Sequence, residues 1–225
     1  MERTECLETI KKHTTTLHKL RKQGVALAAG IIGQSLTKDD FFFCASLDRC
    51  INLIDGFIDV LNQRNLTCAG ALLRLQMDNC MRTYAVFIAE DKAAVIDCII
   101  SGERVNRQVS KDGSQLSDSY LKKELSKIDS GFSDIYDQAS GYIHLSEKAF
   151  YQTVVSCEDY HINFQIGHAL PEKFNPILIE AADAFIHYVK LHYRILDAVV
   201  DSKRRFDSSQ EAPSNAKDTS NEMID

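Results

Sequence analysis

The chain has no tryptophan, only three prolines and only ten glycines among its 225 residues. Proline and glycine are the two residues least compatible with a helix interior, so their scarcity favours helices joined by short loops. The composition, 44% hydrophobic and 26% charged, excludes a disordered protein. The length allows one well-buried domain or two small ones. We therefore expect a predominantly all-α fold.

An excess of positive charge is also missing. Lys and Arg number 26 against 32 Asp and Glu, which gives a net charge of −6. Residues 207–225 hold five acids and one lysine, hence −4 of this total, and leave the remainder near −2. This balance argues against a broad basic surface for sequence-independent nucleic-acid binding, although a small cluster of arginines would escape a count over the whole chain.

Long apolar runs and paired cysteine motifs are absent too. The longest apolar run, Val25 to Ile32, is far shorter than the roughly 20 residues of a membrane span. The N-terminus has no apolar secretion signal, and the seven cysteines include no Cys-x-x-Cys pair. These features predict a cytoplasmic protein with reduced thiols and no membrane partner.

The apolar periodicity predicts three units: an N-terminal helical segment (1–36), a helical bundle domain (37–202) and a disordered acidic tail (203–225). Thr37 and Asp40 resemble a capping box before a helix that opens at Phe41. Period-2 patterns predict a small β-hairpin within 152–166, with Ile162, Phe164 and Ile166 facing inward.

The central prediction is a helix from Ala69 to Ala89. Arg74, Asp78 and Arg82 recur on it at i, i+4 and i+8, so the carboxylate can accept hydrogen bonds from a guanidinium on either side. Downstream, the longest irregular connection contains Arg104, Asn106 and Arg107. Long ordered loops are often functional, which makes these three residues secondary candidates.

The remaining helices are expected over 117–139, with Ser117 as the N-cap, and over 177–200. His192 falls on the buried stripe of the last helix and is interpreted as a core histidine. Glu180, Asp183 and His187 share another face, but no second helix offers matching ligands. The sequence therefore predicts no metal site and no cofactor.

The segments LLRLQMDNCMR and SGYIHLS resemble a group of uncharacterised bacterial helical proteins, over roughly Phe43 to Gly167. A looser resemblance is to HEPN-type helical domains, several of which are ribonucleases or antitoxin-paired toxins of bacterial defence systems. That resemblance implies RNA or a phosphate-bearing small molecule as ligand. The HEPN signature places an Arg four to six residues before a His, and no Arg precedes His144 at that spacing.

Two interpretations remain open. In the first, one polar cleft holds His144 as general acid or base with Arg82 as its catalytic partner, and the ligand-binding residues are Arg74, Asp78, Tyr136 and Ser140. In the second, the same residues form a structural polar network, and the protein is a non-catalytic module that binds a protein partner. The sequence does not decide whether a reaction is catalysed, and it leaves the oligomeric state open.

Overall fold

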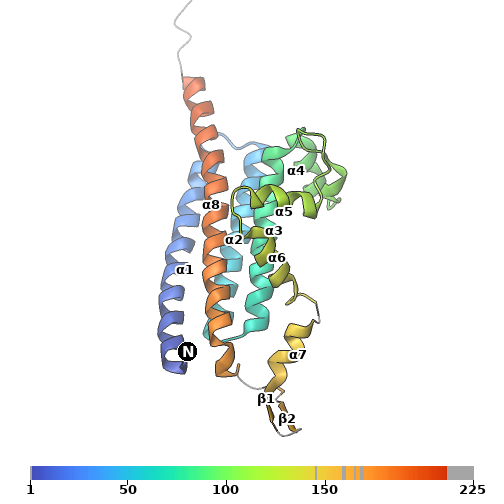
Figure 1. The fold of residues 1–225 in the computed structure, drawn as a ribbon. Helices are drawn as coiled ribbons and strands as arrows, with labels where there is room; N and C mark the ends of the chain where they lie inside the picture. The colour runs from blue at the N-terminus through green and yellow to red at the C-terminus, as the bar shows by residue number, and fades with distance from the viewer. Residues whose placement is uncertain (1, 145, 159–160, 165, 168–169, 212–225) are drawn as a thin grey trace, which may run out of the picture.

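Four long helices form the bundle in the computed structural model, which describes residues 2–144, 146–158, 161–164, 166–167 and 170–211 (Figure 1). The mostly helical prediction is confirmed. The bundle helices are α1 (Arg3–Ile32), α2 (Lys38–Asn62), α3 (Leu66–Ile88) and α8 (Asn175–Glu211). Around the bundle axis α2 packs on α1 and α3, and α8 closes the ring by packing on the same two helices.

The direction of α8 determines the path of the chain between α3 and α8. Helices α1, α2 and α3 run up, down and up, and α8 runs up again, parallel to α3 (Figure 1). The chain therefore descends again outside the bundle, from α4 (Lys92–Ile100) and the short helix η1 (Val105–Arg107) through α5 (Asp118–Ser126) and α6 (Phe132–Ser140). Both α5 and α6 pack on the outer side of α3.

The start of α2 confirms the predicted capping box. The Thr37 side chain accepts a hydrogen bond from the Asp40 backbone N–H, and the Asp40 carboxylate accepts one from the Thr37 backbone N–H. These two bonds satisfy donors that a helix N-terminus would otherwise leave unpaired. The helix begins at Lys38, three residues before the predicted Phe41.

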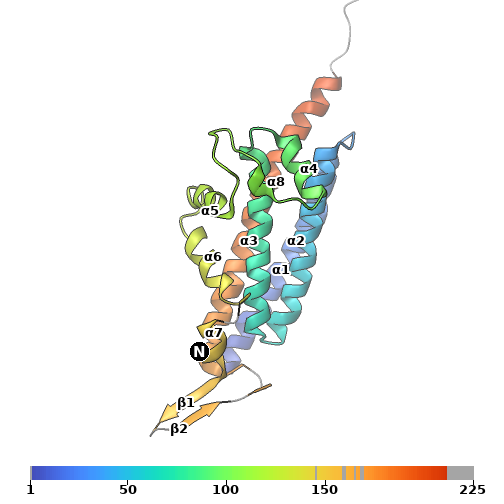
Figure 2. The ribbon, with the colours of Figure 1, turned by 90° about the vertical axis from the view of Figure 1, so that its right-hand side faces the viewer.

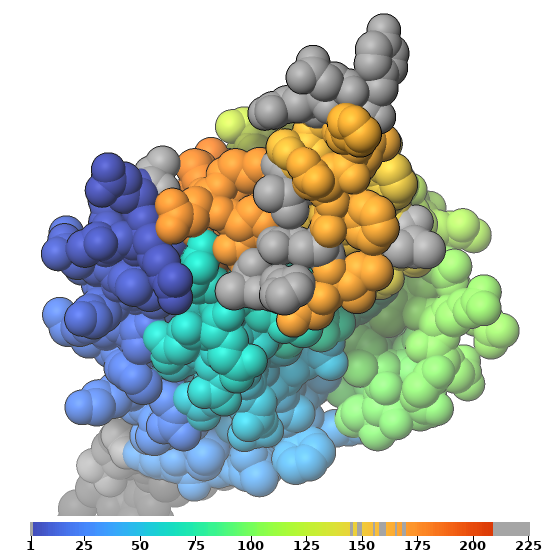
Figure 3. Space-filling model, turned by 90° about the horizontal axis from the view of Figure 1, so that it is seen from below, coloured from blue at the N-terminus to red at the C-terminus, as the bar shows by residue number. Residues whose placement is uncertain are grey.

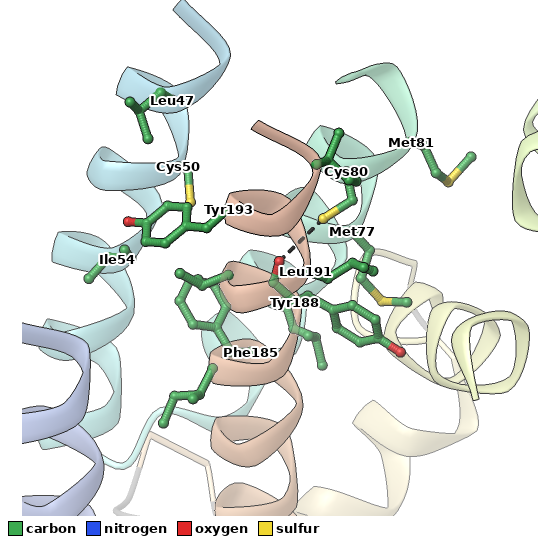
Figure 4. Packing of buried hydrophobic residues seen from close by; sticks show 14 of the residues in the cluster. Leu47, Cys50, Ile54, Met77, Cys80, Met81, Phe185, Tyr188, Leu191 and Tyr193 are labelled. Carbon is green, nitrogen blue, oxygen red and sulfur yellow. Dashed lines mark hydrogen bonds between the residues drawn. The ribbon is translucent and has the colours of Figure 1, made fainter. Parts of the chain in front are cut away.

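The core lies where α2, α3 and α8 meet (Figure 4). Phe185 on α8 stacks on Phe57 of α2 with ring centroids 3.9 Å apart. Cys80 on α3 donates its thiol proton to the backbone oxygen of Tyr188 at 3.3 Å. Burial raises the pKa of the Cys50 thiol to about 12, so this cysteine packs as a neutral apolar group.

The helix predicted over 117–139 is two helices, so this prediction was wrong in its extent. Ser117 caps α5 as predicted, by accepting a hydrogen bond from the Tyr120 N–H. The break at 127–131 is fixed by Asp129, whose carboxylate accepts from the Gly131 N–H and pairs with His187 on α8 at 2.8 Å. Asp and Gly stabilise turns by such local bonds.

The predicted hairpin is present, but its predicted orientation was wrong. The strands β1 (Val154–Glu158) and β2 (His161–Phe164) pair antiparallel after the short helix α7 (Glu147–Thr153). They extend beyond the lower end of the bundle (Figure 2). The three residues expected to face inward are instead exposed: Ile162 by 60%, Phe164 by 65% and Ile166 by 78%.

The lower end of the molecule shows where this segment lies. Seen from below (Figure 3), the yellow and orange atoms of α7, the hairpin and the start of α8 gather on one side, and the blue atoms of α1 lie on the other. A further short helix, η2 (Glu172–Phe174), leads from this region into α8.

Both predicted boundaries of the bundle domain need correction. Residues 1–36 are not a separate segment, because the apolar stripe of α1 is buried in the common core. At the other end α8 continues to Glu211, so 203–211 is helical rather than disordered. Lys203 is itself buried and pairs with Asp40 at 2.5 Å. The rest of the predicted tail, 212–225, lies outside the described residues.

Candidate functional site

A pocket of about 480 Å³ opens between α2, α3 and α4. Its volume lies in the range of roughly 300–1,000 Å³ that is typical of small-molecule sites. One wall is apolar and includes Phe41, Ile99 and Ile100. The polar groups come from the facing turns of α2 and α3, and they are Ser46, Arg49, Asp78, Asn79, Arg82 and Thr83.

Two hydroxyl groups in the lining of this pocket contact a buried imidazole behind them. Ser46 Oγ lies 2.6 Å from Thr83 Oγ1 and 2.8 Å from His192 Nε2. Asn79 fixes the pair of helices by donating from its side-chain amide to the backbone oxygen of Ser46 at 2.9 Å. All four residues are buried, and they join α2, α3 and α8 in one polar network.

The protons of this network depend on the tautomer of His192. Thr83 Oγ1 donates to the backbone oxygen of Asn79 at 2.8 Å. In the tautomer that donates from Nε2, Ser46 donates to Thr83, and the ring cannot take the Ser46 proton.

Burial determines the charge state of His192. Its side chain is fully buried, and burial lowers the pKa of the imidazole to about 3, because the charged form loses its hydration. The ring is therefore neutral at physiological pH. The predicted core position of His192 is confirmed, with hydrogen bonds at Nε2, whereas Nδ1 has no hydrogen-bond partner among the described residues.

Arg74, Asp78, Tyr136 and Ser140 meet in space, as the sequence motifs suggested. The Arg74 guanidinium donates from Nε to Ser140 Oγ at 3.1 Å and from Nη2 to the Tyr136 hydroxyl, and its Nη1 lies 2.6 Å from the Asp78 carboxylate. The guanidinium carbon also lies 3.5 Å from the centroid of the Tyr136 ring. With 14% of its side chain exposed, Arg74 holds α6 against α3 through these contacts.

The predicted ladder of Arg74, Asp78 and Arg82 forms only in its first half. Asp78 pairs with Arg74, whereas Arg82 donates to the Asp118 carboxylate at the start of α5, at 2.7 Å. Asp118 can pair with Arg82 in place of Asp78, because the chain returns along the outer side of α3 and brings the start of α5 to this arginine. Arg82 stays one-third exposed, and it lines the pocket together with Asp78.

Arg49 contributes an unmatched charge to the pocket. Its side chain is exposed at the pocket, and no described residue forms a hydrogen bond or an ion pair with it. Arg49, Ser46 and Thr83 were not predicted from the sequence. Arg49 lies on an exposed polar face of α2, and such a face is shared by most amphipathic helices. Ser46 and Thr83 are single polar residues on buried faces, which the sequence does not distinguish from the core.

His144 lies in the turn after α6, one turn beyond Ser140. Its backbone N–H donates to the Ser140 carbonyl at 3.4 Å, and its side chain is exposed. Within the described part of the chain, its ring has no hydrogen-bond partner, and it lines none of the pockets described here. The catalytic role predicted for His144 stays a prediction.

A second, larger pocket of about 620 Å³ lies between α3, α6, α7 and α8. Its described polar lining includes Glu147 and Glu180 but no Lys or Arg, so this pocket does not suit an anion. In the described ranges, no three His, Cys, Asp or Glu side chains are grouped as metal ligands, and no helix there is long and apolar enough to span a bilayer.

Comparisons of the chain with protein-family models, with curated proteins and with solved structures find no match.

Proposed function

We propose that the pocket between α2, α3 and α4 binds a phosphate-bearing ligand of nucleotide size, either a free nucleotide or the end of an RNA strand. The observation that carries the proposal is the unpaired Arg49 beside Arg82 at a pocket with one apolar wall. A guanidinium suits a phosphate because its planar N–H groups match two phosphate oxygens.

The charges around the pocket support an anionic ligand. Asp78 is the acid of the lining, and Arg74 already neutralises it from the neighbouring network. Arg82 shares its charge with Asp118, which leaves Arg49 as the unmatched charge at this pocket. The apolar wall with Phe41 suits a base or another flat ring, which gains by leaving water.

The sequence motifs receive distinct roles in this proposal. Arg82 binds the ligand and Asp78 keeps the adjacent rim in place. Arg74, Tyr136 and Ser140 act as positioning residues, because their hydrogen bonds hold α6 on α3. RNA cleavage by His144 follows from the enzyme interpretation of the polar motifs, and a part in bacterial defence follows from the HEPN resemblance; both stay predictions. Replacement of His144 by Ala tests the first of these in an RNA cleavage assay.

The test is a calorimetric titration of the full chain with adenosine, with adenosine 5′-monophosphate and with a 5′-phosphorylated RNA oligonucleotide. The expected result is binding of the monophosphate, weakened about tenfold in Arg49→Gln, because one charge-assisted hydrogen bond is worth about 1.5 kcal/mol. Arg3→Gln is the matched control, since Arg3 is exposed at the far end of the bundle.

The outcomes separate the ligand sources. Tighter binding of the RNA end than of the nucleotide, with the same loss in Arg49→Gln, identifies RNA as the ligand. Equal binding of adenosine and its monophosphate, or an equal loss in Arg3→Gln, contradicts the proposal, because neither result involves the pocket arginine.

The exposed hairpin supports a second candidate function, a module that binds another protein without catalysis. Phe164 and Ile162 on β2, and Phe150 on α7, present large apolar side chains to water. An isolated two-stranded hairpin is only marginally stable, and clustered exposed apolar groups often mark contact surfaces. In this alternative the Arg74 network is structural.

A cytoplasmic location is part of the proposal as well. All seven cysteines are free thiols, although Cys68 and Cys157 are exposed. Free exposed thiols are typical of reducing compartments.

A further inference from the structure

A third pocket adjoins the one between α2, α3 and α4, and the two share Arg82. The third pocket has a volume of about 580 Å³ and lies between α3, η1 and the start of α5. Its described lining is mostly polar, with Arg104, Asn106, Ser117 and Ser119 among its residues. We call it the η1 pocket. One pocket with an apolar wall and one polar pocket thus meet at a single guanidinium.

We propose that the two pockets form one site, and that its ligand carries two anionic groups as well as a flat apolar ring, as a nucleoside polyphosphate does. This inference rests on the proposed function and specifies its ligand class. The ring occupies the pocket with the apolar wall, one phosphate group lies between Arg49 and Arg82, and a further phosphate group reaches Arg104 in the η1 pocket.

The pairing of charges around the two pockets supports two anionic groups. Each acid in the lining already has a basic partner: Asp78 has Arg74, Asp118 has Arg82, and Glu103 has Arg107 at 3.6 Å. Two arginines then remain for a ligand.

These two arginines are Arg49 and Arg104, and neither forms a hydrogen bond or ion pair through its side chain with a described residue. They belong to different pockets, and Arg82 lines both. A ligand with one anionic group can match only one of these charges, whereas a chain of phosphate groups that passes Arg82 can match both.

The backbone around η1 prepares Arg104 for this role. Val105 is buried and holds the η1 turn, so its neighbours Arg104 and Asn106 line the pocket. The loop that follows is tied to the end of α3 by hydrogen bonds from the Glu90 N–H to the Val109 carbonyl and from the Lys111 N–H to the Ile88 carbonyl. A site held in this way loses little conformational entropy when it binds a ligand.

Arg107 provides a matched control on the same turn. It has the same side chain as Arg104 and lies three residues away, but it pairs with Glu103 and does not line the η1 pocket. Arg107→Gln removes a positive charge from the loop and leaves Glu103 in the pocket lining without its basic partner, whereas Arg104→Gln removes the proposed phosphate contact. If Arg104 contacts a phosphate group, Arg104→Gln should weaken triphosphate binding more than Arg107→Gln does.

The experiment is a titration of the full chain and its variants with adenosine 5′-monophosphate and adenosine 5′-triphosphate, without divalent cations and at 0.15 M salt, where long-range charge effects are screened over about 8 Å. We expect the triphosphate to bind at least about tenfold more tightly than the monophosphate. Arg104→Gln should remove this preference and leave monophosphate binding within about twofold. Arg49→Gln should weaken both ligands.

Each other outcome overturns a specific part of the argument. If the monophosphate binds through Arg49 but the triphosphate binds no better, the two-pocket inference falls and the proposed function stands. Equal effects of Arg104→Gln and Arg107→Gln also overturn the inference. If neither nucleotide binds, the inference falls, and the proposed function falls too unless the 5′-phosphorylated RNA oligonucleotide binds through Arg49.

Discussion

Replacement of His192 by Gln should make the stability of the protein less dependent on pH. Burial lowers the pKa of His192 to about 3 in the folded state, whereas an unfolded chain has a histidine pKa of about 6.5. Between these two values the unfolded state binds a proton that the folded state excludes. The free energy of unfolding therefore decreases as the pH falls through this window, by up to about 1.4 kcal/mol per pH unit.

The expected loss of stability on acidification follows from the two pKa values of His192. Between pH 7 and pH 5 the linkage relation gives a loss of about 2 kcal/mol from this one imidazole. Gln keeps an N–H donor near the position of Nε2, so it can still reach Ser46 and Thr83, but it cannot be protonated. Wild type should therefore lose about 2 kcal/mol more stability than His192→Gln over this interval.

Urea denaturation at pH 7 and at pH 5, followed by circular dichroism, measures this difference. His18→Gln is the control, since His18 is exposed and forms no described side-chain contact, and it should behave as wild type. Equal losses in wild type and His192→Gln would refute the reasoning, because they would mean that the buried site accepts the charged imidazole.

Two further predictions concern packing and the hairpin. Gly70→Ala should destabilise the protein by about 1–3 kcal/mol in thermal unfolding, because the new methyl group would overlap the ring of Tyr142. The control is Gly56→Ala, where the nearest atom is 3.7 Å away. It should be neutral or stabilising by up to about 1 kcal/mol. Replacement of Ile162 and Phe164 by Thr should change stability by less than about 0.5 kcal/mol, because both are exposed. If the hairpin is a contact surface between copies of the chain, the wild type should associate in sedimentation velocity and the double variant should not. A wild type that stays monomeric over a concentration series would contradict a contact between copies.

The parts of the fold that local sequence determines were predictable. The capping box at Thr37 and the N-cap at Ser117 need only residues within one turn, so both were identified correctly. The break between α5 and α6 was missed because Asp129 gains part of its stabilisation from His187, which is 58 residues away. A regular apolar spacing cannot show a contact of that kind.

The candidate site was predictable in one part only. The Arg74 network was suggested by two polar motifs, and its members do meet. The partner of Arg82 could not be read from helix spacing, because Asp118 reaches it only after the chain has turned back. The sequence could not show that Arg49 is unpaired either, because this depends on which acidic side chains the fold brings close to Arg49.

The hairpin shows a different limit. Alternation of apolar and polar residues identifies strands because side chains alternate between the two faces of a strand. It says nothing about whether another element covers the apolar face. Ile162 and Phe164 therefore belong to a correctly predicted strand with an incorrectly predicted environment.

The parallel course of α3 and α8 has a consequence for the order of events during synthesis. The polar network beneath the proposed site joins Thr83 to His192, which are 109 residues apart, and everything from α4 to η2 is made between them. While α8 is still in the ribosome, Ser46 and Thr83 have no imidazole behind them. The network beneath the pocket is therefore completed only when the last long helix docks. A nascent or C-terminally truncated chain has the arginines of the site without this network.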